Sequence, residues 1–339
     1  MGPVSRPPSV PEELDFRITA PNLEGQPIYL FYYPDCERLA ERVVQASQGR
    51  IQLGRIRWGH FADTFPNVFV TDAHKIRNRH VAFLASFHNP GVILEQKGVI
   101  DTLLDQFLAS FSIILPYFPT GTHERVENPG DVATASTLAG IISDVKLSRS
   151  GRSPLVIFDI HALQERFYFG QNVLPLLESG IPLLRERLKK LPDQDKITIA
   201  YPDEGAWKRF HFQFSGYEEI ICTKVRDGNK RIVKLKEGNP EGKHVIIVDD
   251  LVQSGGTLIE CQKLLSQHGA SAVSAYVTHG VFPKESWRKF QPVEGSNDGA
   301  AFKYFWITDS CAQTCAAVEG SQPFEVLSLA EPIAAALLL

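Results

Sequence analysis

Short runs of apolar residues alternate along the chain with longer stretches of helical periodicity. The runs are rich in β-branched and aromatic residues, which is typical of strands, and turn-forming residues separate them from the amphipathic stretches. This alternation predicts an α/β fold with mostly parallel sheets flanked by helices. A first series of strands is expected at residues 28–32, 51–56, 81–87, 112–118 and 155–161, and a second at 196–202, 219–225, 244–251, 271–280 and 304–310.

Because the alternation runs through two series, we expect two domains, each built on its own sheet. The predicted N-terminal domain comprises residues 27–175, and the C-terminal domain comprises residues 176–324. Residues 1–26 are Pro-rich and lack an apolar signal core, so they are interpreted as a flexible lead-in. The closing apolar segment, residues 325–339, is expected to form a helix that is buried somewhere on the protein.

Composition and charge restrict the partners of the protein. Its 339 residues carry a formal net charge of -4 at pH 7, so no basic face for nucleic acid is expected, and any bound phosphate belongs to a small ligand. No apolar run is long enough to span a membrane. Five scattered cysteines without a C-x-x-C pair favour free thiols in a reducing compartment. We therefore predict a cytoplasmic protein, with an organellar form as the alternative.

The most informative segment is VIIVDDLVQSGGT, residues 245–257, which runs directly into a stretch with helical spacing. Gly255, Gly256 and Thr257 open that helix, whose first amides have no partners inside the helix and therefore favour an anion. The glycines allow the backbone to approach a phosphate closely, and the hydroxyls of Ser254 and Thr257 add hydrogen bonds. The alternative is an ordinary strand-to-helix turn with an N-terminal cap.

Two carboxylates precede this turn and cannot serve a phosphate. Asp249 and Asp250 stand at the carboxyl end of the strand, where the ligands of open α/β sheets gather. From there they would accept hydrogen bonds from vicinal hydroxyls or hold a divalent cation. A sugar phosphate satisfies both the acid pair and the turn. The segment resembles the ribose-phosphate loop of type I phosphoribosyltransferases, although most relatives carry an acidic residue where Gln253 stands.

Two further strand ends predict a magnesium neighbourhood. LVIFDIH places Asp159 and His161 at the end of one strand, and ITIAYPDE places Asp203 and Glu204 at the end of another. Carboxylate oxygens suit magnesium, and a single imidazole can join them when phosphate oxygens and water complete the octahedron. The alternative for His161 is a structural hydrogen bond, which is the commoner role of a lone histidine.

A basic pair closes the strand EIICTKVR. Lys224 and Arg226 are two residues apart, so their side chains point to the same face of the strand and would clamp one polyphosphate. The polar, glycine-bearing loop at residues 227–230 suits a lid that orders on the substrate. The alternative is a solvated basic edge.

These segments, in this order, resemble the phosphoribosyl pyrophosphate synthetases, also called ribose-phosphate diphosphokinases, over nearly the whole chain. The resemblance implies two type I phosphoribosyltransferase-like domains, with the C-terminal helix packed back on the first. In that family a D-x-H strand end and a P-D-x-G strand end bind the metal on ATP, which assigns His161 and Asp203 to Mg2+. The catalytic K-x-R motif of the family matches Lys224 and Arg226.

The resemblance also implies an ATP site shared between subunits. In the family, a Phe-x-Asp segment from a neighbouring subunit contributes to that site, and Phe61 and Asp63 match it, so a homo-oligomer is expected. Where bacterial and animal relatives carry an Arg-Gln-Asp-Arg run against ATP, this chain has THER at residues 122–125, which makes His123 the candidate ATP contact. Phe65 also replaces an acidic residue.

The implied reaction transfers the diphosphoryl group of ATP to the anomeric oxygen of ribose 5-phosphate, giving phosphoribosyl pyrophosphate and AMP. FADTFPN, HALQERFYFG and DDLVQSGGT are most similar to the second class of these synthetases, known from plants, whose members are typically independent of inorganic phosphate and less selective for the nucleotide. Two alternatives stay open: a phosphoribosyltransferase that consumes phosphoribosyl pyrophosphate, and a catalytically silent regulatory homologue. Ribose 5-phosphate would be held by Asp249, Asp250, Gln253, Ser254, Gly255, Gly256 and Thr257.

Overall fold

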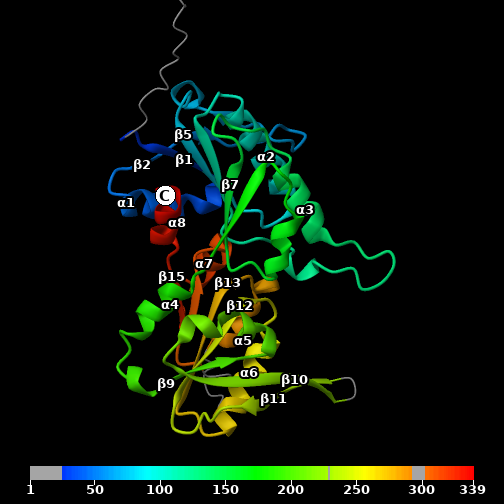
Figure 1. Ribbon diagram of the computed structural model, residues 1–339, viewed down its shortest axis with the longest axis vertical. Coiled ribbons are helices and arrows are strands. Elements are labelled where there is room, and N and C mark those ends of the chain that lie inside the picture. The colour runs from blue at the N-terminus through cyan, green and yellow to red at the C-terminus, as the bar shows by residue number, and fades with distance from the viewer. Residues whose placement is uncertain (1–24, 228–229, 292–301) are drawn as a thin grey trace, which may run out of the picture.

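The computed structural model describes residues 25–227, 230–291 and 302–339, without the side chains of residues 224–232. The predicted lead-in, residues 1–26, therefore lies outside the described residues except for its last two positions. The chain forms two lobes stacked along the long axis of the molecule, and each lobe is built on one sheet (Figure 1). The predicted α/β class is confirmed.

The first sheet has six parallel strands in the order β2-β1-β5-β6-β7-β8. Its strands are β1 (Ile28–Tyr32), β2 (Ile51–Leu53), β5 (His80–Leu84), β6 (Ser110–Ile114), β7 (Ser153–Phe158) and β8 (Val173–Glu178). The α-helices that cover it from within the same lobe are α1 (Glu37–Ala46), α2 (Pro90–Leu104) and α3 (Thr134–Ser143). A two-stranded ribbon adds β3 (Ile56–Arg57) and β4 (Phe69–Val70).

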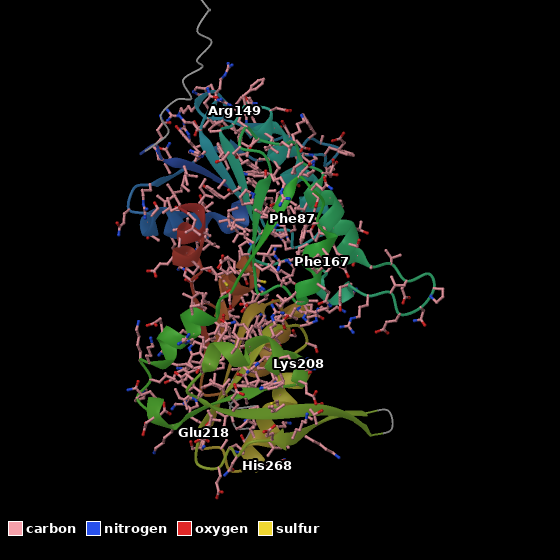
Figure 2. The ribbon with its side chains drawn as sticks, in the orientation of Figure 1. Phe87, Arg149, Phe167, Lys208, Glu218 and His268 are labelled. Carbon is pink, nitrogen blue, oxygen red and sulfur yellow. The ribbon has the colours of Figure 1, made fainter. Side chains whose placement is uncertain are left out.

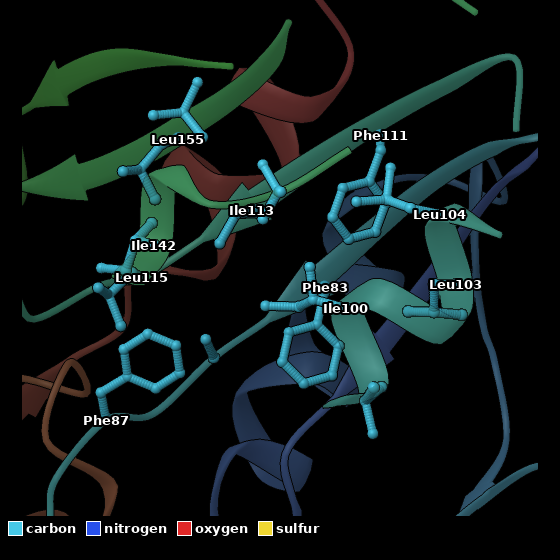
Figure 3. Packing of buried hydrophobic residues seen from close by; sticks show 14 of the residues in the cluster. Phe83, Phe87, Ile100, Leu103, Leu104, Phe111, Ile113, Leu115, Ile142 and Leu155 are labelled. Atoms are coloured by element: carbon cyan, nitrogen blue, oxygen red, sulfur yellow. The ribbon is translucent and has the colours of Figure 1, made fainter. Parts of the chain in front are cut away.

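Side-chain alternation along these strands divides the apolar residues between two cores. Phe83 points to the face covered by α2 and α3, in one cluster with Ile100 and Ile142 (Figure 3). Its neighbour Leu84 joins the opposite core, together with Val43 of α1. Because both faces of the sheet are covered, the central strands are almost wholly apolar, as the runs in the sequence predicted.

The second sheet has seven strands in the order β11-β10-β9-β12-β13-β14-β15, all parallel except the β10–β11 hairpin. Its strands are β9 (Ile197–Tyr201), β10 (Glu218–Asp227), β11 (Lys230–Glu237), β12 (His244–Val252), β13 (Ala272–Gly280), β14 (Phe305–Thr308) and β15 (Phe324–Leu327). Its α-helices are α4 (Ile181–Leu188), α5 (Glu204–Phe210), α6 (Gly256–Gln267) and α7 (Ala312–Val318). The 3-10 helices of the two lobes are η1 (Pro34–Cys36), η2 (Ala73–Lys75), η3 (Gly121–His123), η4 (Leu163–Tyr168), η5 (Gln194–Lys196), η6 (His211–Phe214) and η7 (Pro283–Phe290).

The predicted domain boundary between residues 175 and 176 falls inside β8, which pairs with β7 along its whole length. We propose that the boundary lies after β8, at residues 179–180, where the chain enters α4. The prediction of one helix over residues 325–339 is wrong at its start, because residues 324–327 form β15 beside β14. The alternating Phe-Glu-Val-Leu pattern of this segment suits an edge strand better than a helix.

The last helix, α8 (Ala330–Leu337), returns to the first domain and packs on α1. Ile333 of α8 and Leu39 of α1 share one buried core, and Figure 1 shows the C-terminus beside α1. Within the described residues, none of the helices combines the length and apolar content that crossing a membrane requires.

Candidate active site

Residues that follow β6, β7, β9 and β12 line one cavity of about 820 Å³, to which both domains contribute. The carboxyl ends of parallel strands meet at one edge of a sheet, so these strand ends converge on the same space. Lys208 of α5, labelled in Figure 2, also lines it. The structure thus brings together nine of the predicted site residues: His161, Asp203, Asp249, Asp250, Gln253, Ser254, Gly255, Gly256 and Thr257.

Residues 253–257, which we call the glycine turn, follow β12 and include the first two residues of α6. The two glycines of this turn play different parts. Gly255 has φ +82°, and a Cβ there would lie 2.4 Å from Cζ of Phe290, so glycine alone fits without displacing the ring. A Cβ on Gly256 would meet no atom within 4 Å. The amides of Ser254 and Gly255 have no hydrogen-bond partner in the described part of the chain. These donors are available to an anion.

Asp250 is buried and links the two domains. Its Oδ2 accepts a hydrogen bond from Nδ1 of His161 at 2.7 Å and one from the guanidinium of Arg209 at 3.2 Å. The same guanidinium nitrogen donates to the backbone oxygen of His161 at 2.7 Å. Asp250, His161 and Arg209 therefore form one connected group across the domain interface.

The two carboxylates of the acid pair differ in charge. Burial alone would raise the pKa of Asp250, but the hydrogen bond from His161 and the charge of Arg209 outweigh it and hold that pKa below its usual range. Burial, followed by the neighbouring charge of Asp250, raises the pKa of Asp249 well above its usual range. Asp250 is thus ionised and paired, whereas the surroundings of Asp249 favour its protonated form.

His161 and Asp203 fit the ligand set of a magnesium ion. Because the Asp250 carboxylate only accepts hydrogen bonds, Nδ1 of His161 donates to it, and in the neutral imidazole Nε2 then holds the lone pair that a metal would take. The same hydrogen bond raises the pKa of His161, so a metal at Nε2 would displace a proton. Asp203 is the N-cap of α5, and its Oδ1 accepts from the amide of Ala206 at 3.0 Å. Among the described residues, no three His, Cys, Asp or Glu groups are placed to hold a metal by themselves. Magnesium commonly takes one or two protein ligands and completes its shell with substrate phosphates and water.

The other two members of the predicted magnesium neighbourhood have different roles. Asp159 is buried with φ +35°, and its Oδ2 accepts from the amide of Gly180 at 2.8 Å and from Oγ1 of Thr278 at 2.6 Å. It therefore ties the end of β7 to the second domain and does not line the cavity. Glu204 forms an exposed ion pair with Lys236 at 2.7 Å.

The predicted catalytic pair lies on the β10–β11 hairpin. Lys224 and Arg226 of β10 stand opposite Val233 and Arg231 of β11. β10 also pairs with β9, the strand that leads to Asp203, so the hairpin begins beside the cavity. The structure does not describe the side chains of Lys224 and Arg226, so their catalytic role stays a prediction.

The Phe-x-Asp segment forms an exposed turn away from the cavity. Phe61 and Phe65 are 57% and 62% exposed, on a turn closed by the backbone bridge between His60 and Pro66. Asp63 stabilises this turn by accepting a hydrogen bond from the amide of Phe65 at 3.3 Å. Neither Phe61 nor Asp63 lines the cavity of its own chain.

His123, the candidate ATP contact, lies in η3 and lines an adjoining cavity of about 560 Å³. Thr122, Glu124, Arg125 and His161 line both cavities, so the two cavities lie next to each other. The contact of His123 with ATP stays a prediction.

Lys208 and Arg209 on the cavity wall and Glu165 beside it are charged residues that the sequence analysis missed. Arg209 stands six residues after Asp203, on helix α5, which the structure shows to begin at the cavity. Glu165, in η4, is completely buried: its Oε1 accepts from the amide of Ala162 at 3.1 Å, while its Oε2 has no partner within the described residues. Burial raises the pKa of Glu165 to about 7.

Glu165→Gln is expected to flatten the pH dependence of stability. The pKa of Glu165 rises from an ordinary 4.5 to about 7 on folding, so between these values the folded protein holds a proton that the unfolded chain has lost. The free energy of unfolding therefore falls as pH rises through this window, by about 3 kcal/mol. Glutamine cannot ionise and keeps an acceptor for the amide of Ala162. The stability of the variant relative to the wild type is therefore expected to increase as pH rises. Denaturant unfolding of both proteins at pH 5 and pH 8 measures the effect, and parallel pH dependences would contradict it.

Comparison with known proteins agrees with this geometry. Residues 172–304 match the phosphoribosyl transferase domain family. A solved structure of phosphoribosylpyrophosphate synthetase from Mycobacterium smegmatis aligns with a TM-score of 0.76 at 19% sequence identity, over 92% of this chain and 98% of that one, which shows a shared fold. The fold and the cavity therefore define an α/β protein of two domains, the second of which is of the phosphoribosyltransferase type.

Relatives from plants show to which family within this class the chain belongs. Ribose-phosphate pyrophosphokinase 3, chloroplastic, of Oryza sativa subsp. japonica is 61% identical over 91% of this chain and 76% of its own length. Ribose-phosphate pyrophosphokinase 4 of Arabidopsis thaliana is 59% identical over 93% of both chains, and ribose-phosphate pyrophosphokinase 3, mitochondrial, of Spinacia oleracea is 60% identical over 91% of this chain. The chain belongs to the ribose-phosphate pyrophosphokinase family, which confirms the predicted resemblance and its closeness to plant members.

Proposed function

We propose that this chain transfers the diphosphoryl group of ATP to the anomeric oxygen of ribose 5-phosphate, giving phosphoribosyl pyrophosphate and AMP. Its place in the ribose-phosphate pyrophosphokinase family supports the reaction. The observation that carries the proposal is the common cavity, in which the glycine turn, the acid pair, His161 and Asp203 line the same space of about 820 Å³. A sugar phosphate and the phosphates of a nucleotide would therefore lie side by side.

In this proposal the glycine turn binds the 5-phosphate. The amides of Ser254 and Gly255, which have no partner among the described residues, donate to it, and the start of α6 adds partial positive charge. Asp249 and Asp250, at the end of β12, accept hydrogen bonds from the ring hydroxyls. Gln253 lines the cavity as a neutral amide, so the sugar contact that most relatives make with an acid becomes a hydrogen bond without charge.

His161 and Asp203 would hold magnesium against the nucleotide phosphates, as their positions on the cavity wall allow. When bound, the ion neutralises phosphate charge and orients the chain of phosphates. A bond forms between the anomeric oxygen and the β-phosphorus, and the proton of that hydroxyl passes to water. The bond from the β-phosphorus to the α–β bridging oxygen breaks, and AMP leaves with that oxygen. Lys224 and Arg226 bring positive charge to the transferred group.

We also propose that the Phe61 turn serves a neighbouring subunit. Phe61 is 57% exposed, and it lies with Asp63 outside the cavity of its own chain, as donation to a second copy requires. A homo-oligomer with the nucleotide site at a subunit interface follows.

The formation of AMP distinguishes the proposed reaction from both alternatives. Purified protein is incubated with magnesium, ATP and ribose 5-phosphate, and AMP and phosphoribosyl pyrophosphate are separated by chromatography. We expect equal amounts of the two products. A phosphoribosyltransferase would consume phosphoribosyl pyrophosphate without AMP release from ATP, and a silent regulatory homologue would give neither product while still binding the ligands.

Turnover is expected without inorganic phosphate, and GTP or CTP is expected to support measurable rates. Thr122 stands on the wall of both cavities where bacterial and animal relatives place arginine, so one cation is missing beside the nucleotide phosphates and selectivity should relax. The similarity to plant members supports the same expectation. Initial rates with and without added phosphate, repeated for each nucleotide, test it. Strong activation by phosphate, or strict dependence on ATP, would contradict this assignment and leave the reaction intact.

The compartment is a further part of the proposal. The plant relatives carry chloroplastic and mitochondrial names, and all five cysteines of this chain are free thiols, as a reducing compartment maintains them. We propose a cytoplasmic location, with the organelles of the relatives as the alternative. Imaging of the tagged full-length protein in its own cells separates them.

A further inference from the structure

The 3-10 helix η7 lies directly behind the glycine turn and holds two of its backbone oxygens. Oγ of Ser286 donates to the oxygen of Gln253 at 2.7 Å. Nζ of Lys289 donates to the oxygen of Ser254 at 3.2 Å. These two bonds fix two successive peptide planes of the turn.

The orientation of those planes determines where the amides point. A trans peptide is planar, so its carbonyl oxygen and its amide hydrogen point in opposite directions. The bond from Ser286 to Gln253 therefore turns the amide of Ser254 away from η7, and the bond from Lys289 turns the amide of Gly255 the same way. Both amides belong to residues that line the cavity, and they are unpaired within the described residues. η7 thus directs two free donors at the position proposed for the 5-phosphate.

η7 is itself held in an uncommon conformation. Phe282, Lys284 and Glu285 have φ of 43°, 54° and 56°, a region that residues other than glycine rarely adopt. Such strain persists only where surrounding contacts enforce it, and it concentrates at functional segments. The ring of Phe290 supplies such contacts, because it packs edge-on against Phe282 with centroids 5.6 Å apart and occupies the space beside Gly255.

We propose, building on the proposed function, that Ser286 and Lys289 are positioning residues for ribose 5-phosphate. They do not touch the ligand in this assignment. They orient the peptide planes of the glycine turn so that the amides of Ser254 and Gly255 converge on the 5-phosphate. Ser286 is 9% exposed, so its hydroxyl keeps this bond away from competing water, whereas the Lys289 ammonium makes its bond at the surface.

The test compares Ser286→Ala with a matched serine. Ser286→Ala is expected to raise the Kd for ribose 5-phosphate about fivefold, the effect of losing one hydrogen bond, with the Kd for magnesium ATP unchanged and kcat at saturating ribose 5-phosphate within about twofold. Ser148→Ala is the control, since Oγ of Ser148 also donates to a backbone oxygen, that of Gly151 at 3.2 Å. Figure 2 shows the adjacent Arg149 at the far end of the first domain from Lys208, so this control is expected to change neither Kd.

Lys289→Met provides a second measurement that does not depend on a buried residue. Its side chain is exposed, so the variant is expected to fold normally and to raise the Kd for ribose 5-phosphate about twofold to fivefold. The inference would be overturned if both variants kept the wild-type affinity for ribose 5-phosphate. It would also be overturned if they lost affinity for ribose 5-phosphate and magnesium ATP equally. Calorimetric titration measures ligand binding directly, so it tests the inference even if the wild type forms no AMP. Absence of AMP would contradict the proposed reaction and leave the inference on Ser286 and Lys289 to be tested by binding.

Discussion

Lys224→Ala is expected to lower kcat by about 10²-fold or more, on the order of 3 kcal/mol of lost transition-state stabilisation. The proposed reaction increases negative charge on the transferred diphosphoryl group and on the departing AMP, and positioned cations stabilise that charge most in the transition state. Lys224 lies on β10, beside the strand that leads to Asp203. Since it is not part of the glycine turn, KM for ribose 5-phosphate should change less. Steady-state rates of AMP formation at varied ribose 5-phosphate measure both constants.

Lys234→Ala is the matched control for this substitution. Lys234 is exposed on β11 opposite Thr223, so the control removes the same charge from the same hairpin. It is expected to keep near wild-type kcat. Wild-type turnover in Lys224→Ala would refute the catalytic role, and equal losses in the two variants would show that the net charge of the hairpin matters more than the position of Lys224.

The two sheets were predictable because their central strands are buried on both faces. The four aliphatic residues at the start of the apolar run in β12 are all completely buried, and a short β-branched run of this kind is typical of a parallel strand covered on both faces. Edge elements were harder to predict. β15 is four residues long and half-buried, so its alternation was too short to separate it from the Ala- and Leu-rich helix that follows.

The site residues that the sequence revealed are those at strand ends, because the topology of a parallel sheet alone brings strand ends together. Arg209 and Ser286 reach the site from a helix and a 3-10 helix, and each donates to a backbone oxygen, of His161 and of Gln253 respectively. A backbone acceptor leaves no residue-type signal in the sequence. Such contacts are visible only when the packing of the elements is known.

Asp159 and His161 show a second limit of sequence patterns. Both were expected at the end of one strand, within the predicted magnesium neighbourhood. β7 ends at Phe158, however, and Asp159 has φ +35°, so the alternation is broken between them. Asp159 consequently turns to Thr278 and the domain joint, while His161 turns to Asp250 and the cavity.

The second large effect is expected at the glycine turn. Substitution of Gly255 is expected to affect both stability and ligand binding, whereas substitution of Gly256 is expected to affect ligand binding alone. Gly255→Ala places a non-glycine residue at φ +82° and a Cβ 2.4 Å from the ring of Phe290. The left-handed backbone costs about 1–2 kcal/mol and the overpacking about 1–3 kcal/mol, so the melting temperature should fall by roughly 5–10 °C. Because relief of the contact moves the turn, the Kd for ribose 5-phosphate should rise at least tenfold.

Gly256→Val tests the same turn without the folding cost. A Cβ at Gly256 would meet no protein atom within 4 Å and its φ is ordinary, so the melting temperature should stay within about 2 °C of the wild type. The added methyl groups instead occupy space that the 5-phosphate needs for close approach to the turn, and the Kd for ribose 5-phosphate should again rise at least tenfold. Thermal unfolding and calorimetric titration of both variants distinguish distortion of the turn in Gly255→Ala from steric exclusion of the 5-phosphate in Gly256→Val. Wild-type affinity in Gly256→Val would place the 5-phosphate elsewhere, because a phosphate held by these amides cannot tolerate a branched side chain beside them.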